Sequence, residues 1–381
     1  MKIKVLFLIT AMALINAIAF SKNTASVIFQ KGENGFDTYR IPALVQTNSG
    51  TLLAFAEARK NGGSDTGDID LVLKRSIDNG KTWSDIITIW DEQENVCGNP
   101  CPIVVSETGR IILLSTWNHG RDHKKEINER TSIDTRRVFL MYSDDDGITW
   151  SCPQDITSKA KLPEWTWYAT GPCHGIETST GRLIAPCNHG IFGRQAPAET
   201  VSHVIISDDQ GMNWRIGGSA DTGNESTVTE LSNGDIMLNM RGYRDPERIE
   251  KNNAVRLVAI SHDGGENFKK SYYEKGLIEP VCNGSIISYN HHKYKGILLF
   301  SNPESMDTRE NMTIKISSDD GKTWKRLYSV HKGPAAYSDL AVLHNGDICI
   351  LYECGTDNRY ETISFMRIDK KVIRRKLLYK K

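Results

Sequence analysis

A single octapeptide pattern, Ser-x-Asp-x-Gly-x-Thr-Trp, constrains this chain more than any other feature of its sequence. It recurs five times, with Asn for Thr in two copies and Phe for Trp in one, beginning at Ser76, Ser143, Ser207, Ser261 and Ser317. The Asp side chain can accept backbone N–H bonds and the Gly can adopt a positive φ, so each copy predicts a tight turn. Five copies at near-regular spacing indicate a structural array, and we interpret their Asp residues as turn formers rather than catalysts.

A second repeat marks the units of this array. A turn glycine followed by apolar residues occurs six times, at Gly50, Gly109, Gly181, Gly234, Gly296 and Gly346. Each glycine lies between two apolar runs, which predicts a β-hairpin, and two further strands are expected on either side of the octapeptide turn that follows. Four strands in each of six units predict an all-β fold, a six-bladed β-propeller of four-stranded antiparallel blades.

The last unit differs from the others because it lacks the octapeptide turn and ends near residues 367–368. We expect it to take its fourth strand from Ser26–Gln30, which would close the ring and remove an exposed sheet edge. No helical periodicity of useful length appears, and no linker divides the chain. Residues 20–381 are therefore expected to form a single domain.

Residues 1–19 match a secretory signal peptide, with two Lys, an apolar run over Val5–Ile15 and a small-residue Ala-Ile-Ala site. This run is shorter than the roughly 20 residues that span a membrane, so we expect export to the periplasm or the medium without membrane insertion. The 47 basic residues equal the 47 acidic ones, which gives no electrostatic reason to bind nucleic acid. Eight scattered Cys predict neither a disulfide scaffold nor a metal site, and we expect a monomer.

In a propeller, the loops at one end of the inner strands converge on the central axis. The polar residues expected to meet there are Arg40, Arg59, Asp65, Asn99, Glu225, Arg241, Arg309, Tyr337 and Glu353. Arg guanidinium groups bind carboxylates through paired hydrogen bonds, and several of them around one axis are unfavourable unless an anion lies between them. The set predicts a ligand that carries a carboxylate, and the alternative is that each Arg pairs with a surface acid.

The motif Tyr39-Arg40-Ile41-Pro42, together with the five octapeptide turns known as Asp boxes, resembles the bacterial exo-sialidases, a family of six-bladed propellers. The similarity extends over residues 26–368. It implies that Arg40, Arg241 and Arg309 bind the carboxylate of the substrate, and that Glu353 orients the first of them. It also implies that Arg59 is a further arginine of the pocket.

The same resemblance implies catalytic roles. Tyr337 matches the nucleophile of the family and Glu225 matches the base beside it. The acid matches Asp65, with Asp68 as the alternative, because Asp70 is expected within a strand. Further candidates for the lining of the pocket, for each of which a packing role is the alternative, are Asn99, Trp117 and Trp167.

The resemblance implies hydrolysis of terminal α-linked sialic acids from glycoproteins, glycolipids and oligosaccharides, without a metal or organic cofactor. It also implies retention of configuration through a covalent glycosyl-tyrosine. A neutral phenol suits this substrate, because a carboxylate nucleophile would approach the like charge of the sialic acid. Transfer of sialic acid to another sugar, or within the same molecule, and non-catalytic binding of sialylated glycans are the alternatives that the sequence leaves open.

Overall fold

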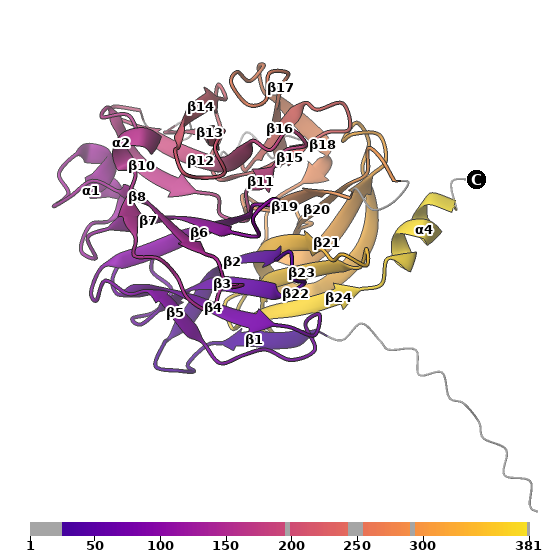
Figure 1. Ribbon diagram of the computed structural model, residues 1–381, viewed down its shortest axis with the longest axis horizontal. Coiled ribbons are helices and arrows are strands. Elements are labelled where there is room, and N and C mark those ends of the chain that lie inside the picture. The colour runs from indigo at the N-terminus through magenta and orange to yellow at the C-terminus, as the bar shows by residue number, and fades with distance from the viewer. Residues whose placement is uncertain (1–24, 195–198, 243–253, 290–293, 379–381) are drawn as a thin grey trace, which may run out of the picture.

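The computed structural model describes residues 25–194, 199–242, 254–289 and 294–378, and the predicted signal peptide lies outside these ranges. Most of the regular structure in them is β-strand, and strands that follow one another along the chain mostly pair antiparallel. Figure 1 shows the sheets succeeding one another around a centre in chain order. The prediction of an all-β fold is confirmed.

The N-terminal part of the ring forms one eight-stranded sheet. Its strands are β2 (Thr38–Gln46), β3 (Leu52–Arg59), β4 (Ile69–Ser76), β5 (Ile87–Trp90), β6 (Val96–Val104), β7 (Ile111–Asn118), β8 (Arg137–Ser143) and β9 (Gln154–Asp155). The neighbours pair antiparallel except β4 and β6, which meet through a parallel pair between Ile69 and Val96. This short contact joins two antiparallel groups, β2–β5 and β6–β9.

The middle of the chain forms two further sheets. The five strands of the first are β10 (Trp165–Thr170), β11 (Ile176–Glu177), β12 (Leu183–Ile191), β13 (Thr200–Ser207) and β14 (Arg215–Ser219). The four strands of the second are β15 (Ser226–Glu230), β16 (Ile236–Met240), β17 (Val255–Ser261) and β18 (Tyr272–Ile278).

A seven-stranded sheet completes the ring. Its strands are β19 (Ser285–Ser288), β20 (Leu298–Pro303), β21 (Glu310–Ser317), β22 (Lys325–Val342), β23 (Ile348–Cys354), β24 (Thr362–Ile368) and β1 (Ser26–Gln30). The long strand β22 joins two groups, because its first part pairs with β21 and its second part with β23. Strand β1 pairs with β24, as predicted, and Figure 1 shows these two ends of the chain side by side.

The inner strands close a cycle of contacts around the centre of the ring. Strand β2 contacts β6, β6 contacts β11, β11 contacts β15, β15 contacts β19, β19 contacts β22, and β22 contacts β2 again. Loops at one end of these strands therefore face a common centre, which is the arrangement that the candidate site requires.

The Asp boxes form the turns that the sequence predicts, as the first copy illustrates. Asp78 accepts hydrogen bonds from the backbone N–H groups of Lys81 and Thr82 at 3.0 and 2.9 Å, and from the Thr82 hydroxyl at 2.7 Å. The hydrogen bond from the Thr82 backbone is the main reason why the pKa of Asp78 is lowered to about 2. The carboxylate is thus occupied in holding the turn, as its role of turn former requires.

The box glycines also lock neighbouring groups of strands together. Gly80 has a φ of 83°, and a Cβ atom placed on it would lie 2.1 Å from the ring of Phe365 on β24. A Cβ on Gly321 would lie 2.7 Å from the side chain of Met237 on β16. Each of these turns packs against the preceding group, so glycine is required there for both its conformation and its lack of a side chain.

Three helices occur in the described ranges: α1 (Lys124–Glu129), α2 (Thr157–Ala160) and α4 (Lys371–Leu378). The sequence shows no helical periodicity of useful length, yet α4 forms a helix of eight residues that buries Ile373 and packs Val372 and Leu377 against the core. Its two turns are too short for a helical period to stand out in the sequence. None of the helices described is long and apolar enough to cross a membrane.

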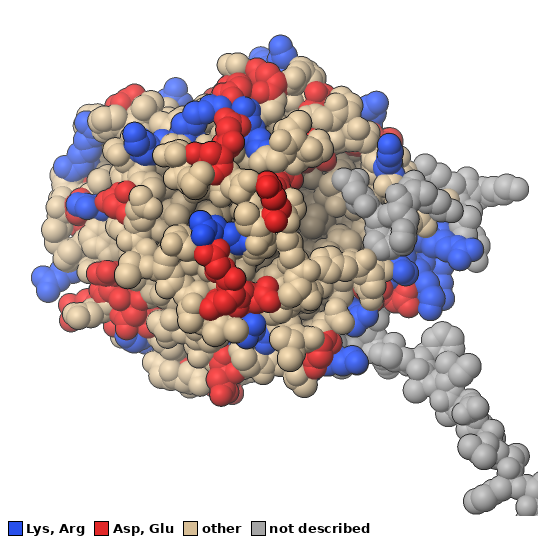
Figure 2. All heavy atoms as spheres, viewed as in Figure 1, with Lys and Arg blue, Asp and Glu red and all other residues tan. Residues whose placement is uncertain are grey.

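Acidic and basic side chains are interspersed over most of the face of the molecule in Figure 2, and a small group of basic side chains lies at its right-hand edge. On that face the described residues form no broad basic surface.

Candidate active site

A cavity of about 390 Å³ opens at the centre of the ring. Eight of the nine predicted site residues line it, namely Arg40, Arg59, Asp65, Asn99, Glu225, Arg241, Arg309 and Tyr337. The ninth, Glu353, is buried beside Arg40. The ring therefore brings together residues that come from widely separated parts of the sequence.

Three guanidinium groups surround the side chain of Tyr337. The guanidinium carbons of Arg40 and Arg309 lie 5.3 and 5.5 Å from the centre of its ring, and Arg241 donates a hydrogen bond of 2.8 Å to its hydroxyl oxygen. Arg40 comes from β2, Arg241 follows β16, and Arg309 precedes β21. A carboxylate bound between these groups would lie directly beside the phenol.

Glu353 holds the first of these arginines in place. Its carboxylate accepts hydrogen bonds from Arg40 Nε at 2.8 Å, from the backbone N–H of Ile41 at 2.9 Å and from that of Tyr337 at 3.0 Å. Glu353 is fully buried, so this charge fixes both the guanidinium and the backbone that carries the phenol.

Tyr337 and Glu225 form a close pair. The phenol oxygen lies 2.7 and 2.6 Å from the two carboxylate oxygens of Glu225, which also forms an ion pair with Arg241. Burial would raise the pKa of Glu225, but the charge of Arg241 and the hydrogen bond from Tyr337 outweigh it and hold the pKa below its usual value. Burial raises the pKa of Tyr337 well above 10. The pair is thus a neutral phenol beside an ionised carboxylate.

Arg59 fixes the loop that carries Asp65. Its guanidinium donates hydrogen bonds to the backbone carbonyls of Gly63 and Ser64 at 2.7 and 2.8 Å, and pairs with Asp65 at 2.8 Å and with Glu57. The surrounding protein displaces water from around Asp65, which by itself would raise the pKa of this carboxyl. The charges of Arg59 and Arg40 outweigh that effect, so the pKa of Asp65 lies below its usual value. With no substrate bound, Asp65 is therefore a carboxylate.

Two other candidates, Asp68 and Trp117, lie outside this cavity, as does Asp70, which was expected within a strand. Asp68 pairs with Lys60 at 3.1 Å, and Asp70 lies within β4, where burial raises its pKa to about 7. Trp117 is partly buried and packs against a core cluster formed by residues of β2–β8, near Arg137. The geometry thus favours Asp65 over Asp68, and it assigns Trp117 the packing role.

Arg136 lines the cavity, although the sequence analysis did not single it out. It donates hydrogen bonds of 2.5 Å to the side-chain oxygens of Asn99 and Asn118, and its guanidinium carbon lies 4.0 Å from the ring of Trp167, which also lines the cavity. Burial lowers its pKa to about 10. A search of the positions that open the third strand of each unit, as Arg136 does before β8, would have found it.

Two further lining residues were missed because they lie outside the recurring strands and turns. Tyr360, between β23 and β24, stacks on Arg40 at 4.0 Å and accepts a hydrogen bond of 3.0 Å from Arg309. Lys124, at the start of α1, pairs with Glu199 at the edge of the cavity.

All eight cysteines are unpaired, and Cys349 is buried in the core as expected. In the described ranges, no three His, Cys, Asp or Glu side chains are grouped closely enough to hold a metal ion.

Comparison with known proteins identifies the family. Residues 50–350 match the BNR repeat-like domain. A sialidase of Bacteroides fragilis is 34% identical over 84% of this chain and 61% of its own length. Sialidase-3 of Mus musculus is 30% identical over 90% of this chain and 93% of its own length. The chain belongs to the sialidase family.

The solved structure of Hadza microbial sialidase Hz136 agrees with this assignment. It is 31% identical to this chain, superimposes with a TM-score of 0.80, and is matched over 91% of this chain and 68% of its own. The ring of antiparallel sheets is accordingly a β-propeller. The chain spans 61% and 52% of the lengths of the sialidases from Bacteroides fragilis and Micromonospora viridifaciens.

Proposed function

We propose that this member of the sialidase family is an exo-sialidase that hydrolyses terminal α-linked sialic acids from glycoproteins, glycolipids and oligosaccharides. The observation that carries the proposal is the contact between Tyr337 and Glu225, ringed by the guanidinium groups of Arg40, Arg241 and Arg309. A binding protein for sialylated glycans would need the three arginines but neither the phenol nor its carboxylate partner.

The three arginines bind the carboxylate of the sialic acid, which brings the anomeric carbon next to Tyr337. The phenol oxygen attacks this carbon while its proton passes to Glu225, and the bond to the leaving oxygen breaks. Because the phenol is neutral before the attack, it approaches the substrate carboxylate without repulsion. Arg241 contacts both partners and stabilises the charge that moves between them.

Asp65 donates a proton to the leaving oxygen. Arg59 and Arg40 lower its pKa in the empty site, and a substrate carboxylate on Arg40 offsets part of that positive charge. Substrate binding therefore raises the pKa of Asp65 and protonates it when a proton donor is required. In the second step Asp65 takes a proton from water, the water oxygen bonds to the anomeric carbon, and Tyr337 leaves and regains its proton from Glu225.

The proposal includes the architecture and location of the enzyme. The strands divide into six blades: β2–β5, β6–β9, β10–β14, β15–β18, β19 to the first part of β22, and the second part of β22 to β24 with β1. Residues 20–381 form one catalytic domain, and residues 1–19 direct export to the periplasm or the medium, where the enzyme acts as a monomer.

NMR of the reaction with sialyllactose isomers tests the activity and its stereochemistry together. We expect free sialic acid to appear first as the α anomer, which then mutarotates. The β anomer as the first product would contradict the glycosyl-tyrosine, and binding without release would leave the non-catalytic alternative. Sialic acid transferred to a second lactose, or released as an internally bridged sugar, would identify a transferase with the same residues.

A further inference from the structure

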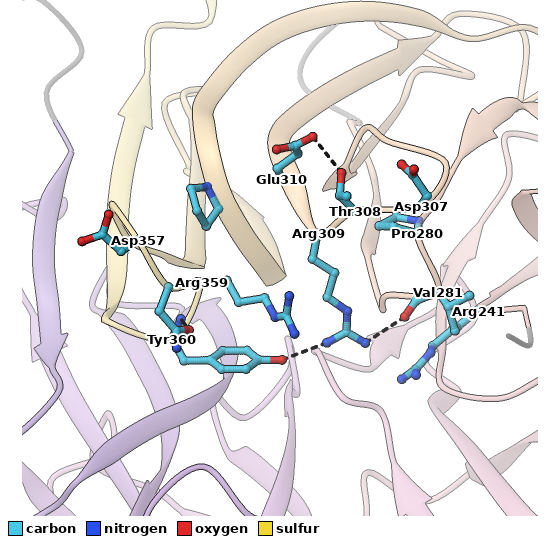
Figure 3. A pocket seen from close by; sticks show the side chains of 12 residues that line it. Arg241, Pro280, Val281, Asp307, Thr308, Arg309, Glu310, Asp357, Arg359 and Tyr360 are labelled. Carbon is cyan, nitrogen blue, oxygen red and sulfur yellow. Dashed lines mark hydrogen bonds between the residues drawn. The ribbon is translucent and has the colours of Figure 1, made fainter.

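A second cavity, of about 750 Å³, adjoins the one that contains Tyr337. Loops 304–310 and 355–360 form most of its wall. Figure 3 shows Arg359 and Tyr360 on one side of Arg309, and Asp307 and Val281 on the other. The two cavities share Arg241, Arg309 and Tyr360 as lining residues. None of the catalytic steps proposed above uses the remaining residues of this second cavity.

Tyr360 stands where the two cavities meet. Its ring packs on the guanidinium of Arg40 at 4.0 Å, inside the first cavity, and its hydroxyl accepts a hydrogen bond from Arg309, which faces the second. Arg309 also donates to the backbone carbonyl of Val281 at 2.8 Å. The guanidinium groups that would hold the substrate carboxylate therefore border both spaces.

The chemistry of the substrate indicates what the second cavity holds. In a sialoside the carboxylate and the leaving oxygen are attached to the same anomeric carbon. Arg40, Arg241 and Arg309 hold the carboxylate in the first cavity, where Asp65 protonates the leaving oxygen. The sugar attached to this oxygen then extends into a space beside Arg241 and Arg309, which line both cavities. The second cavity is such a space, and its size lies within the range that encloses a small ligand.

Three carboxylates and one guanidinium remain in the second cavity once Arg241 and Arg309 are engaged with anions. The carboxylates are those of Asp307, Glu310 and Asp357, and the guanidinium is that of Arg359. The formal charge of this remainder is three negative against one positive, or −2. Carboxylates accept hydrogen bonds from sugar hydroxyl groups, whereas they repel a second carboxylate at short range.

We propose that the second cavity is the leaving-group site, and that Asp307 and Asp357 select neutral sugars over anionic ones. The inference rests on the proposed sialidase activity and adds a preference to it. A sialic acid linked to lactose is a good substrate, and a sialic acid linked to another sialic acid is a poor one, because the second carboxylate enters an acidic site.

Three substrates separate the effect of charge on the leaving group from general effects on catalysis. They are sialyllactose, a disialic acid and a methylumbelliferyl sialoside with a small aryl leaving group. We expect kcat/KM for sialyllactose to exceed that for disialic acid at least about tenfold at about 0.05 M salt. The ratio should fall at about 0.5 M salt, since ions screen the repulsion. A merely steric preference would not depend on salt, and a ratio near one would overturn the proposal.

The double variant Asp307→Asn and Asp357→Asn tests the residues. It should lower the sialyllactose-to-disialic acid ratio about fivefold, with kcat/KM for the aryl substrate changed less than about twofold. The matched control is Asp85→Asn, an exposed acid beside the Asp box of β4, which should leave the ratio unchanged. Equal losses on all three substrates, or an unchanged ratio, would overturn the assignment.

The outcome also separates the two proposals. A wild-type protein that hydrolyses none of the three substrates contradicts the sialidase activity itself. A wild-type protein that hydrolyses all three, with no salt-dependent preference, contradicts only the leaving-group site.

Discussion

The phenol oxygen of Tyr337 lies within 2.7 Å of both carboxylate oxygens of Glu225, although 112 residues separate the two in the sequence. Arg241 contacts both side chains, so a positive charge stabilises whichever partner is negative. The proton can therefore move from phenol to carboxylate without creating an isolated buried charge.

Replacing Tyr337 with Phe removes the nucleophilic oxygen and leaves the three arginines in place. We expect kcat to fall about a thousandfold or more, while the Kd of an unhydrolysable sialic acid glycal changes less than about threefold. Steady-state kinetics and calorimetry measure the two quantities. Tyr142→Phe, on the outer surface, is the control and should alter neither. Near-normal turnover in the Tyr337 variant would contradict its role as nucleophile.

Asp65→Asn should separate substrates by their leaving groups. A lactose leaving group needs a proton, so its hydrolysis should slow about a hundredfold or more. An activated aryl leaving group needs little help and should lose less than about tenfold. Parallel kcat/KM measurements on the two substrates decide the matter. Equal losses of kcat/KM on the two substrates would show that Asp65 is not the acid.

Glu353→Gln removes the buried counter-charge of Arg40 but keeps the shape of the side chain. We expect the free energy of unfolding to fall by about 3 kcal/mol, because a buried guanidinium loses its ion-pair partner. KM should rise more than kcat falls, since Arg40 binds substrate but does not react. Denaturant unfolding and kinetics measure both effects, with the exposed Glu107→Gln as the control. An unchanged KM would show that Glu353 does not position Arg40.

Arg136→Lys keeps a positive charge but loses the planar fork that reaches Asn99 and Asn118. We expect KM to rise about tenfold, corresponding to the loss of one charge-assisted hydrogen bond. Its neighbour Arg137 lies on the surface beside Asp134, so Arg137→Lys provides a matched control that should leave KM unchanged. If the Lys variant binds substrate normally, Arg136 has only a structural role.

The buried pair of His189 and His203 makes stability depend on pH. Their Nδ1 atoms lie 3.1 Å apart, and His203 also contacts the Tyr168 hydroxyl. Burial lowers the pKa of His189 to about 3 and that of His203 well below 6.5. The unfolded chain then binds more protons than the folded one below pH 6.5, so the free energy of unfolding falls as the pH falls.

At pH 5.5 each of these histidines should lower the free energy of unfolding by about 1.4 kcal/mol relative to neutral pH. Urea unfolding at pH 7.5 and 5.5 measures the difference. The variant His203→Gln keeps a polar group at this position and should reduce the pH dependence by about half. If the variant has the same pH dependence as the wild type, groups other than His203 cause the loss of stability at low pH.

Local chemistry explains why much of the fold could be predicted. The Asp boxes and turn glycines act over a few residues, so Asp78 and Gly80 specify their turn wherever the rest of the chain lies. The period of these turns then predicts the number and order of strands. Helix α4 was missed because two turns of helix carry too little pattern, and its apolar face is defined only by the core it contacts.

The candidate site could be predicted where a residue belongs to a motif. Arg40 stands in one, and Tyr337 and Glu225 open inner strands of the ring. Arg136 and Tyr360 could not be found in this way, because their positions in the cavity depend on packing between segments far apart in the sequence. For the same reason, sequence could not separate Trp167, which lines the cavity, from Trp117, which does not.

The pairing of β1 with β24 bears on how the protein is made. A ribosome releases β1 before every other strand of the ring and β24 after all of them. Strand β1 therefore cannot form its hydrogen bonds with β24 until all the other strands have been synthesised. The same delay applies to Arg40 on β2, whose counter-charge Glu353 lies on β23. A nascent chain thus cannot assemble its anion-binding pocket until β23 has left the ribosome.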